Sequence, residues 1–506
     1  MEAKQVDLAP PVLLIHPADT VAVALRPLAA GAEVEVAGKA VVLRDDVPAG
    51  HKLARRSVAE GEQVFKYGHV IGHATRPIPE GAWVHTHNLR TDLEGARAYR
   101  YEPVRTAPQQ SGGEAPVFMG YRRVSGRVGT RNEIWVLNTV GCVNTAAEMI
   151  ARMAREELAD AGVDGVYAFS HPYGCSQLGD DLVNTRRVLA GLMRHPNAGG
   201  ILVIGLGCEN NQMADLLAEA GDVDESRVRF FNAQDVADEI ETGLDLCREL
   251  AGIMASDRRQ ACSVSDLVLG VKCGGSDGYS GVTANPLVGR ATDRLTAYGG
   301  TALMTEVPEM FGAEQQLMNR AQDEQVFERV VGMINRFKEY FIAHGQPVYE
   351  NPSPGNKDGG LTTLEEKSLG ATQKGGRAIV TQVLEYGEQA RRGGLALVNA
   401  PGNDAVSSTA LTVSGATVIL FTTGRGTPLG FPAPTVKIST NTPIYEKKTH
   451  WIDFNAGALI DGTASMDELE NALLRFILDV ASGRVQARNE VNGVREIAIW
   501  KQGVTV

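Results

Sequence analysis

The sequence predicts an α/β protein with a small all-β domain at its start and a large body built on parallel sheets. Short β-like runs separated by turn residues fill residues 1–95, which is typical of a small all-β domain. From residue 121 onward, apolar strands alternate with helical stretches, and this alternation predicts parallel sheets. The polar, aperiodic residues 96–120 are predicted to be a linker, and the body is predicted to divide into residues 121–260 and 261–506.

The composition is that of an ordinary globular protein and argues against several classes of function. The chain has 506 residues, of which 43% are hydrophobic, and its net charge of −12 argues against a nucleic-acid partner. Its apolar runs fall short of the roughly 20 residues that span a bilayer, so no membrane partner is expected. Six cysteines do not make a disulfide scaffold, and residues 1–7 lack a signal-peptide pattern. We therefore expect a reduced, cytoplasmic protein.

The small domain contains one pair of histidines that could bind a metal. Its β-like runs include residues 12–15, 20–25 and 39–43. His85 and His87 lie two positions apart, so on a strand they would face the same side. Two imidazoles on one face can bind a divalent ion, and an exposed or hydrogen-bonded pair is the equally weighted alternative.

Cysteines recur at a regular interval through the body. Cys142, Cys175 and Cys208 are 33 residues apart, and Cys273 follows after 65, close to twice that interval. About 30 residues make one strand–helix–strand unit. The spacing therefore predicts four thiols at the carboxyl ends of parallel, Rossmann-like strands, on one edge of one sheet. Cys247 falls instead on the apolar face of a helix and is predicted to lie in the core.

The strand-end thiols have three possible roles besides simple packing. They could line a pocket, bind soft iron or hold an iron–sulfur cluster, and we predict Cys175, Cys208 and Cys273 as metal ligands. Burial as small apolar side chains is the alternative. No Cys-x-x-Cys pair is present in the sequence, so zinc-ribbon or thioredoxin chemistry is not indicated.

Other strand-end residues supply the candidate catalytic groups. Glu306 follows a short apolar strand and is predicted to be a ligand or a base, although a solvated face is the usual reading of such acids. His171 lies in the loop before Cys175 and is a second candidate base. Asp277 lies in the glycine-rich loop after Cys273, where the backbone can approach a ligand, and is predicted to be a ligand or an acid.

Four further residues are candidates for binding a substrate. Arg425 lies between two glycines and could hold a carboxylate through both arms of its guanidinium, with a surface salt bridge as the alternative. Residues 351–360 are rich in proline and glycine and are predicted to be irregular. Asn356 and Lys357 in this loop, together with Ser276, are predicted to bind the substrate. The loop runs into a polar stretch suited to hydroxyl-rich ligands, made of Thr362, Thr363, Glu365, Lys367 and Ser368.

Long motifs spread over nearly the whole chain resemble one enzyme family. The motifs are residues 85–88, 139–144, 173–181, 205–212, 273–278, 306–309, 351–356 and 423–428. Together they resemble the altronate dehydratase branch of the altronate/galactarate dehydratase family. The resemblance implies an N-terminal SAF-like β-clip domain, a two-part dehydratase body, and conversion of D-altronate to 2-keto-3-deoxy-D-gluconate in hexuronate catabolism. It also implies Fe2+ as cofactor, with Mn2+ in relatives.

The chemistry of such a reaction defines what the site must contain. Water loss from a 2,3-dihydroxy acid needs a base at C2, an acid for the C3 hydroxyl and a cation to stabilise the enediolate. A sugar-acid hydro-lyase with one metal ion is the first hypothesis, and a galactarate or other sugar-acid dehydratase uses the same chemistry. An iron–sulfur dehydratase and a sugar-acid sensor without turnover are the alternatives. The small-molecule substrate is the main partner, and we expect a homo-oligomer.

Overall fold

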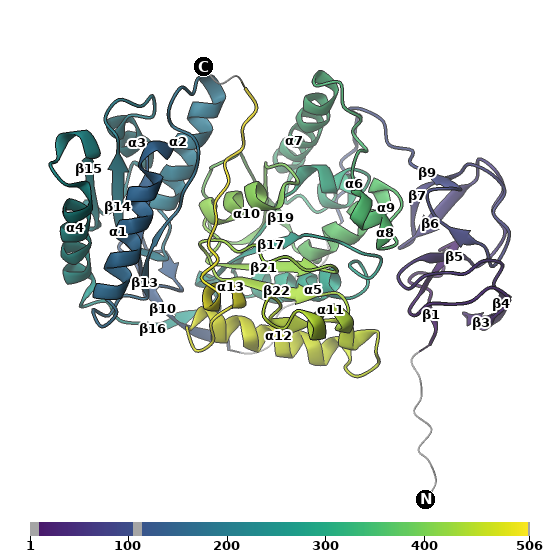
Figure 1. Cartoon of the computed structure of the whole chain (residues 1–506). Coiled ribbons are helices and arrows are strands. Elements are labelled where there is room, and N and C mark those ends of the chain that lie inside the picture. The colour runs from purple at the N-terminus through teal and green to yellow at the C-terminus, as the bar shows by residue number, and fades with distance from the viewer. Residues whose placement is uncertain (1–9, 105–113, 504–506) are drawn as a thin grey trace, which may run out of the picture.

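The computed structural model describes residues 10–104 and 114–503, which form three parts arranged in a row (Figure 1). The small all-β part lies at one end, and an α/β unit with a four-stranded sheet lies at the other. An α/β unit with a seven-stranded sheet lies between them. The predicted fold class, an all-β domain followed by an α/β body with parallel sheets, is confirmed.

Short antiparallel strands form the small domain. Their side chains alternate between a buried and an exposed face, as in β3, where Val34 and Val36 are buried and Glu35 is exposed. This period of two explains the short β-like runs of the sequence. The strands are β1 (Val12–Leu13), β2 (Val21–Ala24), β3 (Glu33–Val36), β4 (Lys39–Val42), β5 (Lys52–Ala54), β6 (Gln63–Lys66), β7 (His69–Ala74), β8 (Trp83–Val84) and β9 (Leu89–Arg90).

The predicted linker is ordered wherever it is described. The Val104 amide donates to the Asn319 carbonyl oxygen at 2.9 Å, and the Arg97 amide donates to Asn335 Oδ1 at 3.2 Å. After residues 105–113, which lie outside the described residues, the chain forms β10 (Val117–Arg122). β10 pairs antiparallel with β16 (Gln260–Ser263) and with β11 (Val128–Gly129). The end of the predicted linker is therefore a strand with regular backbone hydrogen bonds.

The four-stranded sheet is parallel and has the order β13–β12–β14–β15. Cys247 is fully buried in this unit among apolar side chains such as Ile150 and Leu250, which confirms its predicted place in the core. The elements are β12 (Glu133–Asn138), α1 (Asn144–Glu157), β13 (Gly165–Ala168), α2 (Gly179–Met193), β14 (Ala198–Gly205), α3 (Met213–Ala220), β15 (Val228–Asn232) and α4 (Glu239–Met254).

The seven-stranded sheet is also parallel, with the order β19–β20–β18–β17–β21–β22–β23. Its strands are β17 (Val268–Cys273), β18 (Thr301–Met304), β19 (Val380–Leu384), β20 (Gly394–Val398), β21 (Val418–Thr423), β22 (Thr435–Ser439) and β23 (Phe454–Asn455). Its helices are α5 (Ala284–Ala297), α6 (Glu314–Met318), α7 (Glu324–Ala343), α8 (Pro354–Asp358), α9 (Leu364–Ala371), α10 (Asp404–Val413), α11 (Thr442–Lys447), α12 (Met466–Ala481) and α13 (Arg488–Val491).

The four strand-end cysteines lie on two sheets, so the prediction that they share one sheet edge is wrong. Cys142, Cys175 and Cys208 follow β12, β13 and β14, whereas Cys273 ends β17 of the other sheet. Between the two sheets the chain passes through β16, which pairs with β10. A spacing close to twice 33 residues fits two arrangements equally well. The chain can form one more strand of the same sheet between two cysteines, or it can pass to a second sheet, as it does here.

Candidate active site

The strand order of the seven-stranded sheet reverses at β17. From β17 the chain builds β18, β19 and β20 on one side, then returns to build β21, β22 and β23 on the other. Ligands of open α/β sheets bind outside the carboxyl ends of the strands at such a switch point. Cys273 ends β17, Glu306 follows β18, and Arg425 follows β21, so three predicted site residues lie at this edge.

The Cys273 thiol is buried between a lysine and a carboxylate. Lys374 Nζ lies 2.7 Å from Cys273 Sγ, and the thiol donates to Glu309 Oε2 at 3.2 Å. The residue is only 2% exposed. Burial, together with the charge of Glu309, raises the pKa of the Cys273 thiol to about 12. The thiol is therefore protonated near neutral pH unless a cation binds to it.

Glu306 holds an unusual backbone conformation to reach the same cluster. Its φ of +68° lies in the left-handed region, which costs about 1–3 kcal/mol for a residue with a side chain. This turn brings Glu306 Oε1 to 2.5 Å from Lys272 Nζ and Oε2 to 3.2 Å from the Cys273 amide. Burial raises the pKa of Glu306, against the opposing effect of Lys272.

Three lysines balance the carboxylates of this cluster. Lys272 Nζ contacts both Glu306 and Asp404, the latter at 2.6 Å, and Lys367 Nζ lies 2.8 Å from Glu309 Oε1. Burial disfavours the Glu309 carboxylate, but Lys367, Lys374 and Lys272 outweigh it and lower its pKa to about 2. Sequence reasoning did not single out Lys272, although a lysine inside an apolar strand is rare enough to mark a functional site.

Three side chains of this cluster could hold one metal ion. In residues 10–104 and 114–503, the group of His, Cys, Asp or Glu side chains that can converge on one ion is Cys273, Glu306 and Glu309, whose ligand atoms lie within 4.8 Å of one another. One thiolate with two carboxylates is a donor set that divalent iron and manganese accept. The residues present therefore fit a divalent metal ion.

The predicted substrate-binding residues surround one rim of the cluster. Asn356 is the third residue of α8, and this short helix is found where the sequence predicted an irregular loop. Its Oδ1 accepts a hydrogen bond from Lys367 Nζ at 3.1 Å, and its Nδ2 donates to the Ser276 carbonyl at 2.9 Å. Lys357 follows on the same helix and is partly exposed. Asn356 thus positions Lys367, which Asn351 Oδ1 also contacts at 2.9 Å.

Arg425 is exposed and lies against two glycines of this rim. A Cβ atom at Gly275 would lie 3.3 Å from Arg425 Cβ, and one at Gly355 would lie 3.8 Å from Arg425 Nε. Glycines at both positions leave the guanidinium room to approach a ligand. The structure therefore brings Ser276, Asn356 and Arg425 together at this rim, and their role in binding a substrate stays a prediction.

Asp277 and His171 have structural partners at every polar atom of their side chains. Asp277 Oδ1 accepts hydrogen bonds from Tyr279 and Ser280, and its Oδ2 accepts from Thr440 and Asn441. His171 lies in the other α/β unit, where one ring nitrogen lies 2.8 Å from the Asn138 carbonyl and the other accepts from the Tyr173 amide. Burial lowers the pKa of His171 and raises that of Asp277. Both side chains are therefore held by hydrogen bonds, and a catalytic role for either stays a prediction.

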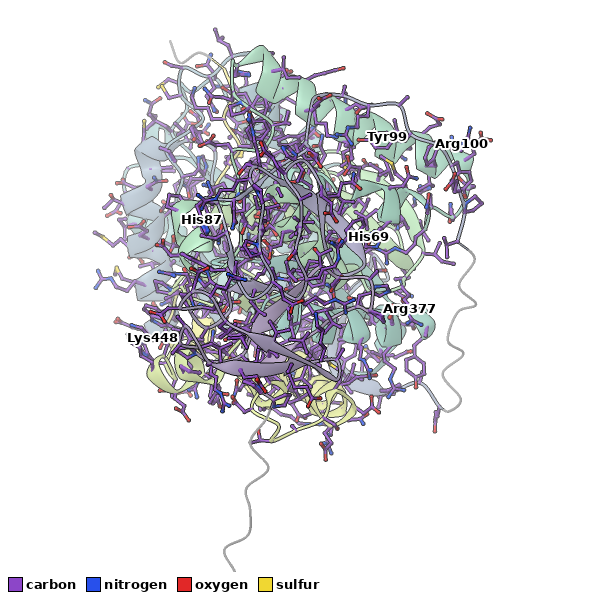
Figure 2. All side chains as sticks on the ribbon, turned by 90° about the vertical axis from the view of Figure 1, so that its right-hand side faces the viewer. His69, His87, Tyr99, Arg100, Arg377 and Lys448 are labelled. Carbon is purple, nitrogen blue, oxygen red and sulfur yellow. The ribbon has the colours of Figure 1, made fainter. Side chains whose placement is uncertain are left out.

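His85 and His87 lie in a turn after β8, so the prediction of one strand face is wrong. The Asn88 side chain closes this turn by accepting from the His85 amide at 2.9 Å. The His85 ring stacks on Trp83, and its Nδ1 lies 3.1 Å from Thr362 Oγ1 of the body. Burial and Lys52 lower the pKa of His85 to about 4. His87 is exposed, and Figure 2 shows it well apart from His69.

The small domain is locked onto the body through a buried ion-pair triad. Glu366 of α9 receives Lys52 Nζ at one carboxylate oxygen and Lys66 Nζ at the other, both at 2.8 Å. The next residue, Lys367, reaches Glu309 in the cluster. The short helix α9 therefore connects the small domain to Lys367, and Figure 1 shows α9 beside the small domain.

Cys175 and Cys208 are not part of this cluster. Both are exposed and lie at the edge of the four-stranded sheet. The five predicted metal ligands, His85, His87, Cys175, Cys208 and Cys273, are therefore not brought together by the structure.

A larger cavity lies elsewhere and does not mark the site. It measures about 1290 Å³ between the two α/β units and is lined by several arginines. Two of them, Arg123 and Arg227, pair with Asp257 at 3.5 and 2.7 Å. None of the predicted site residues lines it, so the chemistry of the Cys273 cluster is the better guide than cavity size.

The fold and this cluster define a class: an α/β enzyme with a buried, charge-balanced centre that can take a metal ion. Family comparisons then identify the family. The SAF domain model of altronate/galactarate dehydratases matches residues 10–92, and the model of the second domain of D-galactarate dehydratase/altronate hydrolase matches 120–255. The model of the C-terminal region of D-galactarate/altronate dehydratase matches 264–505. The chain belongs to the altronate/galactarate dehydratase family.

Three relatives show how close the similarity is. Altronate dehydratase of Escherichia coli (strain K12) is 53% identical, covering 97% of this chain and 99% of that protein. Altronate dehydratase of Bacillus subtilis (strain 168) is 49% identical with the same coverage. Galactarate dehydratase (L-threo-forming) of Escherichia coli (strain K12) is 34% identical over 90% of each chain. The chain is an enzyme of the hydro-lyase class, and a sensor without turnover is excluded.

In the part of the chain that the structure describes, no helix has the length and the apolar character needed to cross a bilayer.

Proposed function

We propose that this enzyme dehydrates D-altronate to 2-keto-3-deoxy-D-gluconate in hexuronate catabolism, with Fe2+ as its cofactor. The observation that carries the proposal is the buried cluster of Cys273, Glu306 and Glu309 at the switch point of the seven-stranded sheet. The relatives named altronate dehydratase are also more similar to the chain than the galactarate dehydratase relative. Mn2+ is the alternative ion for the same ligands.

The charges of the cluster support a divalent ion. Without an ion, the carboxylates of Glu306, Glu309 and Asp404 are balanced by the ammonium groups of Lys272, Lys367 and Lys374, and the thiol is neutral. A divalent ion would add two positive charges to a buried site, where net charge is costly. Loss of one proton from Cys273 and one from Lys374, whose Nζ and Sγ lie 2.7 Å apart, restores neutrality.

The protein's own groups then perform the proton transfers. Cys273, Glu306 and Glu309 would hold the ion, which supplies Lewis-acid stabilisation of negative charge on the substrate. Lys374 Nζ, once deprotonated, takes the proton from C2, because a buried lysine can act as a general base. Lys367, held by Asn351 and Asn356, donates a proton to the departing C3 hydroxyl, which leaves as water. The enol that remains loses its C2 hydroxyl proton to Lys367 and gains a proton at C3 from Lys374, which yields the 2-keto acid and restores both lysines.

The rim residues orient the substrate for this reaction. Arg425 binds the substrate carboxylate, since its guanidinium is exposed above Gly275 and carries a permanent charge. Ser276 and Lys357 face the sugar hydroxyls from the neighbouring loop and from α8. Neutralising the substrate's negative charge with Arg425 keeps the buried cluster itself neutral.

Anaerobic turnover assays with added Fe2+ test the proposal. D-Altronate should yield keto acid faster than galactarate or related sugar acids, and removal of iron with a chelator should abolish the reaction. Cys273→Ala and Glu309→Gln should lose iron binding and turnover together. Lys338→Met is the control, because Lys338 forms a buried pair with Glu314 outside the cluster. Full turnover by Cys273→Ala, or conversion of galactarate alone, would contradict the proposal.

We also propose that the enzyme is a cytoplasmic homo-oligomer. All six cysteines are free thiols, which fits a reducing compartment. The four-stranded unit exposes apolar side chains at Leu178 and Val183, which suit contact with a second copy. Light scattering after size exclusion measures the mass, and a monomer at every concentration would contradict the assembly.

A further inference from the structure

The four-stranded sheet has a switch point of its own. From β12 the chain builds β13 on one side and then β14 and β15 on the other, so the strand order reverses at β12. This is the position at which open α/β sheets bind ligands. Each strand that meets there is followed by a loop carrying one exposed cysteine: Cys142 after β12, Cys175 after β13 and Cys208 after β14.

Hydrogen bonds join the three cysteine loops to one another. The Gly141 amide donates to the Tyr173 carbonyl at 2.8 Å, and the Asn211 amide donates to the Gly174 carbonyl at 3.1 Å. The Ser176 amide donates to Asn210 Oδ1 at 2.8 Å, which links the loop after β13 to the loop after β14. Because adjacent strands lie about 5 Å apart, the three strand ends span about 10 Å. The three loops that carry the thiols are therefore joined to one another at one edge of the sheet.

The loops also approach each other closely enough to require glycine. A Cβ atom at Gly174 would lie 2.1 Å from the Thr139 carbonyl oxygen, and Gly174 has a φ of +100°. Ser176, the residue after Cys175, has a φ of +53° although it is not glycine. Such strain is retained when the surrounding structure holds the loop in one conformation.

From this geometry we propose that Cys142, Cys175 and Cys208 bind an iron–sulfur cluster. A single ion does not fit the described positions, because the three sulfur atoms do not all lie within 4.8 Å of one another. Two thiolates bound to one ion at about 2.3 Å each would be at most about 4.6 Å apart. A multinuclear cluster spans more widely separated thiolates, and thiolates are its usual ligands. Ligation converts each thiol to a thiolate and releases one proton per cysteine.

The surroundings of the thiols suit a cluster with one open iron. Gln234 Nε2 lies 3.6 Å from Cys208 Sγ, and hydrogen bonds to ligating sulfur tune such centres. Ser176 Oγ lies 3.8 Å from Cys175 Sγ. Cubane clusters are usually held by four thiolates, so three leave one iron free for an exogenous ligand. Cys273 cannot be the fourth ligand, because it is buried in the other sheet.

Anaerobic reconstitution of the full chain with ferrous and ferric iron and sulfide tests the proposal. The parent protein should gain visible charge-transfer absorbance and acid-labile sulfide. Cys142→Ser, Cys175→Ser and Cys208→Ser should each lose most of the sulfide that the parent holds, because each removes one thiolate ligand. A cysteine-reactive maleimide should label the three thiols before reconstitution and be excluded afterward, which provides a readout that does not depend on activity.

Cys273→Ser separates this site from the proposed active-site ion. This variant should keep the sulfide and the visible absorbance while losing the single iron of the other sheet. Circular dichroism of each variant shows whether it is folded. Absence of sulfide in the reconstituted parent, iron bound without sulfide, or full sulfide in the Cys142/Cys175/Cys208 triple serine variant would each overturn the proposal.

Discussion

The two parallel sheets place the same residue type at the same topological position in different surroundings. Cys273 is buried among lysines and glutamates, whereas Cys142, Cys175 and Cys208 are exposed beside amide and hydroxyl groups. A cysteine at the carboxyl end of a strand therefore marks a site without specifying its chemistry. The neighbours do that: alternating buried charges support proton transfer, and accessible thiols support a soft, sulfur-rich centre.

The largest effect should come from removing the proposed base of the buried cluster. Lys374→Gln should lower kcat on D-altronate by about 10²- to 10⁴-fold, the usual contribution of a general base. Steady-state turnover at saturating Fe2+ measures this, and a changed pH profile would separate lost proton transfer from lost structure. Lys338→Met should keep most of the turnover. Equal losses of turnover in the two variants would mean that Lys374 contributes through buried ion pairing and not as a general base.

The second prediction concerns the buried ion-pair triad of Glu366, Lys52 and Lys66, which attaches the small domain to the seven-stranded unit. Glu366→Leu would leave Lys52 and Lys66 buried without their carboxylate, which costs about 3–5 kcal/mol. Urea unfolding should show this loss, and turnover should fall because α9 also carries Lys367. The triple variant with Lys52→Met and Lys66→Met should recover stability, since apolar groups then fill the same volume. A Glu366→Leu protein as stable as the parent would contradict the lock.

Acid should weaken the ion-pair triad of Glu366, Lys52 and Lys66 and so lower the stability of the folded protein. Burial disfavours the Glu366 carboxylate, but Lys52 and Lys66 outweigh it and lower its pKa from 4.5 to about 2. A lowered pKa in the folded state contributes stability above pH 4.5, and this contribution is lost as pH falls toward 2. Unfolding midpoints between pH 6 and pH 2 measure the loss, which should be larger in the parent than in the triple variant, because the variant lacks the Glu366 carboxylate.

A fourth prediction sharpens the contrast between the two sheets through iron binding. The pKa of the Cys273 thiol is raised to about 12, so the ion must displace its proton at any ordinary pH. If Lys374 also loses its proton, affinity for Fe2+ should rise about 100-fold for each pH unit gained. Anaerobic calorimetry in buffers of different ionisation enthalpy counts the protons released. Release of fewer than one proton would show that the thiol is not a ligand.

The smallest effect concerns the exposed rim. Arg425→Lys keeps the charge but loses the paired hydrogen-bond donors, so KM for D-altronate should rise about tenfold with kcat little changed. Initial rates over a range of substrate concentrations separate the two constants. Unchanged kinetics would make Arg425 a surface residue and remove the link between the rim and the buried cluster.

Much of the fold and part of the site could be predicted from the sequence. Strand–helix alternation predicted the parallel sheets, and strand ends located Cys273, Glu306 and Arg425, because position along a strand is a local property. The partners of a side chain are not local. The contact of Lys374 with Cys273 spans 101 positions, and that of Lys52 with Glu366 spans 314. His171 and Asp277 also have partners in distant segments, Asn138 for His171 and Thr440 for Asp277, and these contacts could not be predicted from the sequence.

Glu306 keeps a backbone conformation that the fold alone would give to glycine. Its side chain also meets Lys272, but that lysine has a second partner in Asp404, so the ion pairing would survive the loss of Glu306. A descendant of this protein released from selection for turnover would therefore gain stability by exchanging Glu306 for glycine or asparagine. Under the proposed function, a glutamate retained at residue 306 would mark a protein still selected to hold the metal ion.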